Sequence, residues 1–305
     1  MEKYYKKKIK KSEKIVCIGD LHGGLQQIKS LWKNLEKELG TELKKTIVIF
    51  LGDYCDKGGM ETKQLIDWLI KLKKSRGKKM TRFLCGNHDF SFACFLGRKT
   101  IPTDPKTLPP DLDTTIPKHI KPNRYIKYKI KGGMHFQGRR WGHYKSKYRS
   151  ANTFISYGIK KGNITNKLQI RQQLIDNVPN SHKKFLRELE WVIMLKTKFP
   201  PYKIICVHAG LIPDRPAKIQ LKALKKRDIG DKNIQLEYGR IHPICGRDKA
   251  MHPDLVNKSI LISGHFGYNE INKDRIIIDN CGKKGCEPDA VLNAIILPER
   301  KIISS

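Results

Sequence analysis

Hydrophobic residues in the first part of the chain follow two alternating patterns. Short unbroken apolar runs occur at residues 15–18 and 47–51, and each is rich in β-branched side chains and ends at a glycine, which is typical of a buried strand. After each run, apolar residues recur every three or four positions, over residues 25–39 and 61–74, as on one face of a helix. This alternation predicts an α/β fold built on a layered sheet.

Three later apolar runs predict further strands, at residues 82–85, 204–207 and 260–262. A helical spacing of apolar residues over 181–196 predicts a helix that packs on the sheet. Residues 98–181 fit neither pattern, because six prolines fall between positions 102 and 122 and favour an extended surface loop.

The first 14 residues are basic and contain no apolar stretch. A secretory signal needs such a stretch, and no run in the sequence approaches the ~18 apolar residues of a membrane span. We therefore expect a solvated basic tail at residues 1–14. One domain should follow over residues 15–305, with residues 98–181 as a loop-rich insertion within it.

The chain is strongly basic, with 62 Lys and Arg against 29 Asp and Glu and a formal net charge of +33 over 305 residues. Such a field attracts phosphates, phosphoproteins, nucleic acids and acidic membranes alike. A lysine-rich composition spread over a solvated surface has the same net charge. The charge alone therefore does not choose a partner.

All eight cysteines lie in or beside apolar strands or in glycine-flanked loops, and no CxxC pair occurs among them. This placement is typical of reduced, mostly buried thiols. We therefore expect an intracellular protein, cytoplasmic or nuclear. A zinc site at Cys281 and Cys286 is not expected, because no His or Cys cluster lies nearby.

Each of the five predicted strands leads into a glycine-adjoined loop that carries carboxylate, amide or imidazole groups: Asp20 and His22, Asp53 and Asp56, Asn87 and His88, His208, and His265. Asp53 follows its strand almost directly, and its two carboxylate oxygens could bridge two cations. In two-metal hydrolytic sites the ions lie about 3.5–4 Å apart, which one carboxylate can span. The pattern therefore predicts a metal site with Asp53 at its centre.

In this order the motifs GDLHG, GDYCDKG, GNHD, HAG and GH resemble those of the phosphoprotein phosphatases in the calcineurin-like metallophosphoesterase superfamily. Longer phrases, such as FLCGNHDFSFACFLG, MHFQGRRW and SGHFG, are similar to plant-type Rhizobiales-like phosphatases from about residue 15 to the C-terminus. The resemblance implies a sandwich of two mixed β-sheets flanked by helices. It also implies a bimetal centre, a phosphoprotein substrate and a preference for phosphotyrosine.

The resemblance implies two overlapping sets of metal ligands: Asp20, His22 and Asp53 for one ion, and Asp53, Asn87, His208 and His265 for the other. Oxygen and nitrogen donors without thiolate suit Mn, Fe or Zn, and we favour Mn. His135 and His143 are not expected to be ligands, because these six residues complete the implied set.

The resemblance also implies catalytic and phosphate-binding residues. His88 would donate a proton to the leaving oxygen, and Asp56 would keep its imidazole oriented and charged. Lys57 stands where the family has arginine, and lysine lacks the planar fork that grips two phosphate oxygens. Arg247 matches the second family arginine and would provide the bidentate grip. The sequence has HAG rather than HGG and lacks SAPNY, which favours tyrosine over serine and threonine substrates.

Other functions remain open at this stage. A serine/threonine phosphatase and a dinucleoside polyphosphate hydrolase share the implied fold. A nucleic-acid phosphodiesterase is less favoured, because that branch ends in GHxH where this chain has Gly267. A non-enzymatic function as a basic binding module is the least favoured alternative, because all six implied metal ligands are present in the sequence. The basic aromatic stretch at residues 125–157 could read a phosphopeptide, bind single-stranded nucleic acid or form a packed subdomain.

Overall fold

The computed structural model describes residues 14–108, 134–142, 148–159, 167–236, 239–282, 285, 287 and 289–305. Most of the expected basic tail, four of the six prolines and His143 lie outside these residues. The predicted N-terminal tail and the proline-rich part of the insertion therefore stay predictions.

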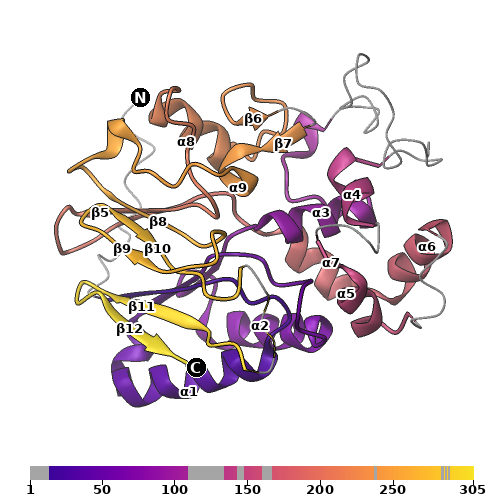
Figure 1. Ribbon diagram of the computed structural model, residues 1–305, viewed down its shortest axis with the longest axis horizontal. Coiled ribbons are helices and arrows are strands. Elements are labelled where there is room, and N and C mark those ends of the chain that lie inside the picture. The colour runs from indigo at the N-terminus through magenta and orange to yellow at the C-terminus, as the bar shows by residue number, and fades with distance from the viewer. Residues whose placement is uncertain are drawn as a thin grey trace.

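Two five-stranded sheets form the centre of the molecule (Figure 1). The first has the order β12-β11-β1-β2-β3, with β1 at Ile15–Ile18, β2 at Ile47–Phe50, β3 at Thr81–Phe83, β11 at Asn293–Leu297 and β12 at Lys301–Ser304. The second has the order β4-β5-β8-β10-β9, with β4 at Ile193–Lys196, β5 at Lys203–Cys206, β8 at Ile260–Ser263, β9 at Glu270–Ile271 and β10 at Arg275–Ile277. Strands β6 (Gln235–Leu236) and β7 (Arg240–Ile241) form a separate short pair.

Both sheets are mixed. In the first, β1, β2 and β3 run parallel, and β11 and β12 add antiparallel strands at one side. In the second, β5, β8 and β10 run parallel, between antiparallel β4 and β9. The parallel strands of each sheet therefore bring their C-terminal loops to one edge, where ligands bind in open α/β sheets.

The strands read as unbroken apolar runs because both of their faces are buried. Alternate residues of β1 face opposite ways: Ile15 and Cys17 join the core between the two sheets, whereas Val16 and Ile18 join the core beneath the helices. Strand β2 divides its side chains in the same way. Burial on both faces is typical of parallel strands covered by other layers.

Nine α-helices in the described residues surround the sheets: α1 (Leu25–Leu39), α2 (Thr62–Arg76), α3 (Asn87–Leu96), α4 (Phe136–Trp141), α5 (Ala151–Ser156), α6 (Lys167–Asn177), α7 (Asn180–Arg187), α8 (Ala217–Lys226) and α9 (His242–Cys245). In Figure 1, α1 and α2 lie outside the first sheet, and α8 lies on the opposite side of the molecule, beyond the second. This is the predicted sandwich of two mixed sheets flanked by helices.

Most of the predicted elements are confirmed. The helices expected over 25–39 and 61–74 are α1 and α2. The helix expected over 181–196 is wrong in its second half, because α7 ends at Arg187 and residues 193–196 form β4. Ile193 pairs with Cys206 of β5, so sheet pairing overrides the helical spacing there. Where residues 98–181 are described, they include α4, α5 and α6.

The cysteines within the described residues follow the prediction with one exception. Cys17, Cys55, Cys85, Cys94, Cys206 and Cys245 are free thiols. Cys281 is disulfide-bonded, to a partner outside the described residues, so the expectation that every cysteine is reduced is wrong.

Among the described helices, none is both long and apolar enough to cross a membrane.

Candidate metal centre and active site

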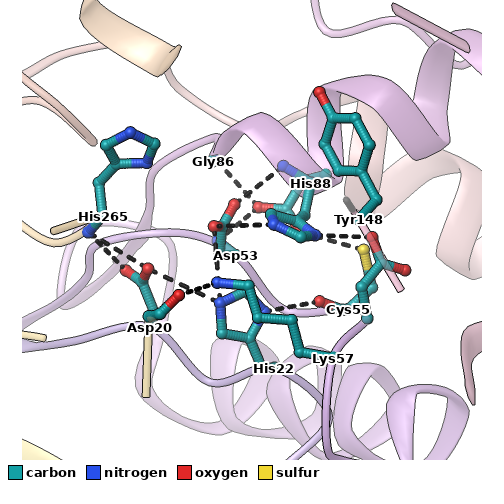
Figure 2. Close-up of polar contacts among 12 residues, drawn as sticks. Asp20, His22, Asp53, Cys55, Lys57, Gly86, His88, Tyr148 and His265 are labelled. Carbon is teal, nitrogen blue, oxygen red and sulfur yellow. Dashed lines mark hydrogen bonds and ion pairs between the residues drawn. The ribbon is translucent and has the colours of Figure 1, made fainter. Parts of the chain in front are cut away.

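The loops that follow the strands of both sheets meet at one place (Figure 2). Asp20 follows β1 and Asp53 follows β2, and the two strands are parallel neighbours. The backbone carbonyl of Asp53 accepts hydrogen bonds from the N–H groups of Leu21 and His22, at 3.1 and 2.8 Å. The two loops are thus held together directly, with their carboxylates on the same side.

Asp53 is the centre of this site. Its Oδ2 lies 3.4 Å from Nε2 of His208, 3.7 Å from Nε2 of His22 and 3.9 Å from Nε2 of His88. Asp53 therefore belongs to two groups of side chains able to hold a cation: one with His22 and His88, and one with His208 and His265. One carboxylate shared by two groups is the arrangement expected of a bridging ligand.

Asp20 also lies within this site. Its Oδ2 is 3.8 Å from Nε2 of His22, and its carboxylate accepts from the backbone N–H of His265 at 3.2 Å. The loops after β1 and β8 are therefore joined through this carboxylate. Five of the six implied ligands lie together, and the sixth, Asn87, is the residue directly before His88.

The imidazoles are oriented by backbone carbonyls. Nδ1 of His22 donates to the carbonyl of Cys55 at 2.9 Å, and Nδ1 of His208 donates to the carbonyl of Leu51 at 2.7 Å. In the neutral imidazole the opposite nitrogen, Nε2, then carries the lone pair that can bind a cation. This is the support that metal-bound histidines usually have.

Several buried polar atoms at the site have no hydrogen-bond partner within the described residues: Nε2 of His22, His208 and His265, and Oδ1 of Asn87. Leaving a buried polar atom unsatisfied costs roughly 1–3 kcal/mol. Four such atoms around two carboxylates form a set of nitrogen and oxygen donors for cations. These residues therefore fit the two divalent metal ions that the sequence implies.

The electrostatics of the site also favour a cation. Burial raises the pKa of Asp20 well above its usual value, and the nearby carboxylates of Asp279 and Asp53 raise it further. Burial opposes ionisation of Asp53 too, but the adjacent His208 and His88 hold its pKa well below the ordinary range. Burial disfavours charge on His208, yet Asp53 and Asp20 raise its pKa to about 10. The carboxylates thus require positive charge beside them.

Unusual backbone geometry is concentrated here. His22, Asp53, Asp56, Lys57 and His265 all have positive φ, at 40°, 54°, 76°, 59° and 71°. Non-glycine residues rarely adopt this region, and such strain tends to gather at functional sites.

Two glycines leave room for the carboxylates. A Cβ at Gly86 would lie 2.0 Å from Oδ1 of Asp53, and one at Gly264 would lie 2.2 Å from Oδ1 of Asp20. Any side chain at these positions would displace a carboxylate, which explains the glycines of the GNHD and SGH motifs.

His88 and Asp56 form the predicted pair. Nδ1 of His88 lies 2.7 Å from Oδ2 of Asp56, and an ionised carboxylate can only accept, so this nitrogen carries the proton. Nε2 of His88 is then directed to the Asp53 side of the site, at 3.9 Å from Oδ2. The geometry leaves His88 able to exchange a proton there.

Two residues that the sequence did not single out for this role hold Asp56 in place. Nε1 of Trp141 donates to Oδ2 of Asp56 at 2.6 Å, and the Thr153 hydroxyl donates to Oδ1 at 2.6 Å. The same hydroxyl accepts from the backbone N–H of Asp56 at 2.9 Å. Trp141 and Thr153 come from α4 and α5, within residues 98–181, and no local sequence signal connects them to Asp56.

Asp89 was also missed. Its carboxylate accepts from the backbone N–H groups of Asp53, Tyr54 and Gly86, at 2.7, 2.8 and 2.9 Å. Burial and the charge of Asp53 raise the pKa of Asp89 to about 7. Asp89 fastens the Asp53 loop to the start of α3, and its place as the last residue of GNHD was the available signal.

Lys57 and Arg247 flank the site. Burial, followed by the charge of His208, lowers the pKa of His265, and Arg247 and Lys57 add to the effect. Arg247 is exposed, whereas the Lys57 ammonium donates to the carbonyl of Gly282.

The described part of the basic aromatic stretch is packed. Trp141 is fully buried, and the Tyr148 ring meets the His88 ring edge-on at 4.8 Å (Figure 2). The Tyr148 hydroxyl donates to Gln137 and accepts from Ser91, at 3.3 and 3.0 Å. This favours the packed-subdomain interpretation for these residues. His135 lies outside both candidate metal groups.

A family model described as calcineurin-like phosphoesterase matches residues 13–239. This range is well over half of the sequence, and the chain therefore belongs to that family of metal-dependent hydrolases. Comparison with curated proteins gives no match.

Three solved structures are similar over most of the chain. A protein assigned as a diadenosine tetraphosphatase is 17% identical with a TM-score of 0.48, over 96% of this chain and 93% of that one. A protein serine/threonine phosphatase from Saccharomyces cerevisiae with similarity to human phosphatase PP5 is 12% identical with a TM-score of 0.44, over 97% and 80%. Hypothetical protein PH1004 from Pyrococcus horikoshii OT3 is 12% identical with a TM-score of 0.43, over 96% and 86%.

Proposed function

We propose that this protein is a bimetal-dependent phosphomonoester hydrolase that removes phosphate from phosphotyrosine in proteins. The observation that carries the proposal is the convergence on Asp53 of the His88–Asp56 pair and the orphaned nitrogens of His22 and His208. A proton donor and a cation site thus share one carboxylate.

The proposed metal ligands are those expected from the sequence: Asp20, His22 and Asp53 for one ion, and Asp53, Asn87, His208 and His265 for the other. Bound divalent cations, with Mn favoured over Fe and Zn, would supply a reactive water and neutralise phosphate charge. The proposed ligands offer nitrogen and oxygen atoms and no thiolate. This donor set supports Mn, Fe or Zn over a metal that is held mainly by cysteine.

His88 acts on the leaving group. Its Nε2 gives a proton to the oxygen that leaves phosphorus, while Nδ1 stays bonded to Asp56. Trp141 and Thr153 keep the Asp56 carboxylate from rotating away. The imidazole thus keeps one orientation through the reaction.

Lys57 and Arg247 hold the phosphate group. Arg247 is exposed beside the site, and its planar guanidinium can grip two oxygens at once. Lys57 supplies a point charge, and it must exchange the Gly282 carbonyl for a phosphate oxygen to do so.

The choice of phosphotyrosine rests on the sequence resemblance, with HAG in place of HGG and no SAPNY motif. Family membership supports the hydrolysis of a phosphate ester. It does not identify which phosphate ester is the substrate. The test must therefore compare substrate classes directly.

The experiment measures kcat/KM of the Mn-loaded protein on four substrates: a phosphotyrosine peptide, the matching phosphoserine peptide, a dinucleoside tetraphosphate and a bis-aryl phosphodiester. We expect the phosphotyrosine peptide to be preferred. A preference for phosphoserine, for the dinucleotide or for the diester would each replace the proposal with the corresponding activity. No turnover on any of them with Mn, Fe or Zn would remove the enzymatic proposal.

A further inference from the structure

A buried arginine lies directly behind the candidate metal centre. Arg275 begins β10, next to β8, and is only 3% exposed. Its guanidinium donates five hydrogen bonds, to the carbonyls of Lys249, Leu261, Ile276 and Ala209 at 2.8, 3.3, 2.7 and 3.4 Å, and to the Ser263 hydroxyl at 2.6 Å.

These five acceptors are all uncharged, and the charge of Glu270 only partly offsets the cost of burial. Burial accordingly lowers the pKa of Arg275 to about 10. Taking a charged side chain out of water costs several kcal/mol, and an apolar residue would fill the same place in a sheet more cheaply. We therefore expect the buried guanidinium to have a role that an apolar side chain could not provide by packing alone.

Three of the acceptors lie within two residues of proposed site residues: two are on loops, and Ser263 is the last residue of β8. Ala209 is next to His208, Ser263 is two positions before His265, and Lys249 is two positions after Arg247. Arg275 therefore donates hydrogen bonds to three segments that are distant in sequence, each of which carries a proposed site residue.

The three segments also contact one another and their surroundings: the Ala209 N–H donates to the Pro243 carbonyl at 2.8 Å, and the His265 N–H donates to the Asp20 carboxylate. The backbone N–H of Gly264 donates to the carbonyl of His208 at 3.1 Å, which joins the first two. The third packs closely on the first, since a Cβ at Gly210 would lie 2.1 Å from the Asp248 carbonyl. The guanidinium is a single group bonded to all three segments.

We propose that Arg275 is a positioning residue that sets His208, His265 and Arg247 relative to one another. It thereby preorganises the site of the second cation and the adjacent phosphate grip. This inference rests on the proposed function. Residues that orient metal ligands from behind typically change metal affinity about 10- to 100-fold when mutated.

The variants separate positioning from general stability. Arg275→Met removes the charge and all five donors, Arg275→Lys keeps the charge but not the fork, and Ser263→Ala removes one acceptor only. Arg76→Met is the matched control. Arg76 donates to the carbonyls of Leu43 and Thr46 at 2.9 and 2.7 Å and to the Thr81 hydroxyl at 3.1 Å.

The control is remote from the site. Thr46 directly precedes β2 and Thr81 begins β3, whereas the proposed ligands follow strand ends. Arg76→Met should therefore lower stability without touching the metal centre.

Two quantities are measured for each metal-free protein: the melting temperature, and the Kd for Mn²⁺ by calorimetric titration. We expect Arg275→Met to raise the Kd of the weaker binding step about 10- to 100-fold, Arg275→Lys and Ser263→Ala to raise it less, and Arg76→Met to lower the melting temperature alone. KM for substrate should rise in Arg275→Met even at saturating Mn²⁺, because Arg247 is displaced.

Unchanged Mn²⁺ affinity in the Arg275 and Ser263 variants, with the parent binding normally, would overturn the inference and leave the proposed function intact. If Arg275→Met does not fold, Arg275→Lys and Ser263→Ala decide the question by the same titration. A parent protein that binds no divalent cation would instead refute the bimetal proposal itself.

Discussion

Replacing Asp56 by asparagine tests the proposed proton donor with little change of shape. Oδ2 of Asp56 accepts from His88 and Trp141, and Oδ1 accepts from the Thr153 hydroxyl. Asparagine can place its carbonyl at the Oδ2 position and its amide nitrogen towards Thr153, whose hydroxyl can rotate to accept. The variant therefore keeps the His88 orientation and loses the negative charge beside it.

The size of the effect follows from the hydrogen bond that changes. A hydrogen bond to a charged group contributes about 1.5–3 kcal/mol, and about 1.4 kcal/mol corresponds to a tenfold change in rate. Asp56→Asn should therefore lower kcat on alkyl phosphates about 10- to 150-fold. His88→Ala removes the donor itself and should cost the ~100- to 10,000-fold typical of general acid catalysis.

The pKa of the leaving group determines how large the loss of kcat is in each variant. A tyrosyl phenol has a pKa of about 10, far below that of an aliphatic alcohol, so its anion leaves with less help from a proton. The assay measures kcat at saturating Mn²⁺ for phosphate esters of graded leaving-group pKa. We expect the slope of log kcat against that pKa to be steepest in His88→Ala, intermediate in Asp56→Asn and shallowest in the parent.

Trp141→Phe is the matched control. It removes one donor to Asp56 but keeps the carboxylate charge and an aromatic ring against Phe92. Because Thr153 still donates to Oδ1 of Asp56 and the charge is kept, its slope should lie between those of the parent and Asp56→Asn. Parallel lines for the parent and His88→Ala would refute the reasoning, because His88 would then act on the metals or on phosphate rather than on the leaving oxygen.

Three further outcomes are expected. Chelation should abolish turnover and lower the melting temperature, since the buried carboxylates repel one another without cations, and Mn²⁺ should restore both; full activity in a chelated, dialysed sample would contradict the bimetal mechanism. Lys57→Ala should lower kcat/KM by about 10- to 150-fold, as for a charge-assisted contact of about 1.5–3 kcal/mol, and Lys57→Arg should raise it; no change in either would place Lys57 outside phosphate binding. Burial lowers the pKa of His135 from 6.5 to about 4, so the unfolded chain binds the proton more tightly and stability falls as the pH drops through this range. Urea unfolding of metal-free protein should show about 2 kcal/mol of this loss between pH 7.5 and 5. His135→Asn can still accept from the Gln137 N–H and should lack that part of the pH dependence; an equal loss in parent and variant would contradict the assignment.

The sequence by itself determined the five strands β1, β2, β3, β5 and β8, the two long helices and the loops that carry the site. These features are local, because a short β-branched run that ends at a glycine and a polar residue favours a strand end within a window of a few residues. Parallel pairing of β1 with β2, and of β5 with β8, then brings Asp20, Asp53, His208 and His265 to the ends of adjacent strands. Much of the candidate site could therefore be predicted without coordinates.

Only the tertiary structure decided which residues support those loops. Trp141 and Thr153 bond to Asp56 from 85 and 97 positions away, and Arg275 reaches Ala209 across 66 positions. Residues 193–196 became a strand because Cys206 and its neighbours were available for pairing, against their own helical spacing. Such contacts depend on how distant segments pack, and packing has no signature within the short windows from which secondary structure and motifs are recognised.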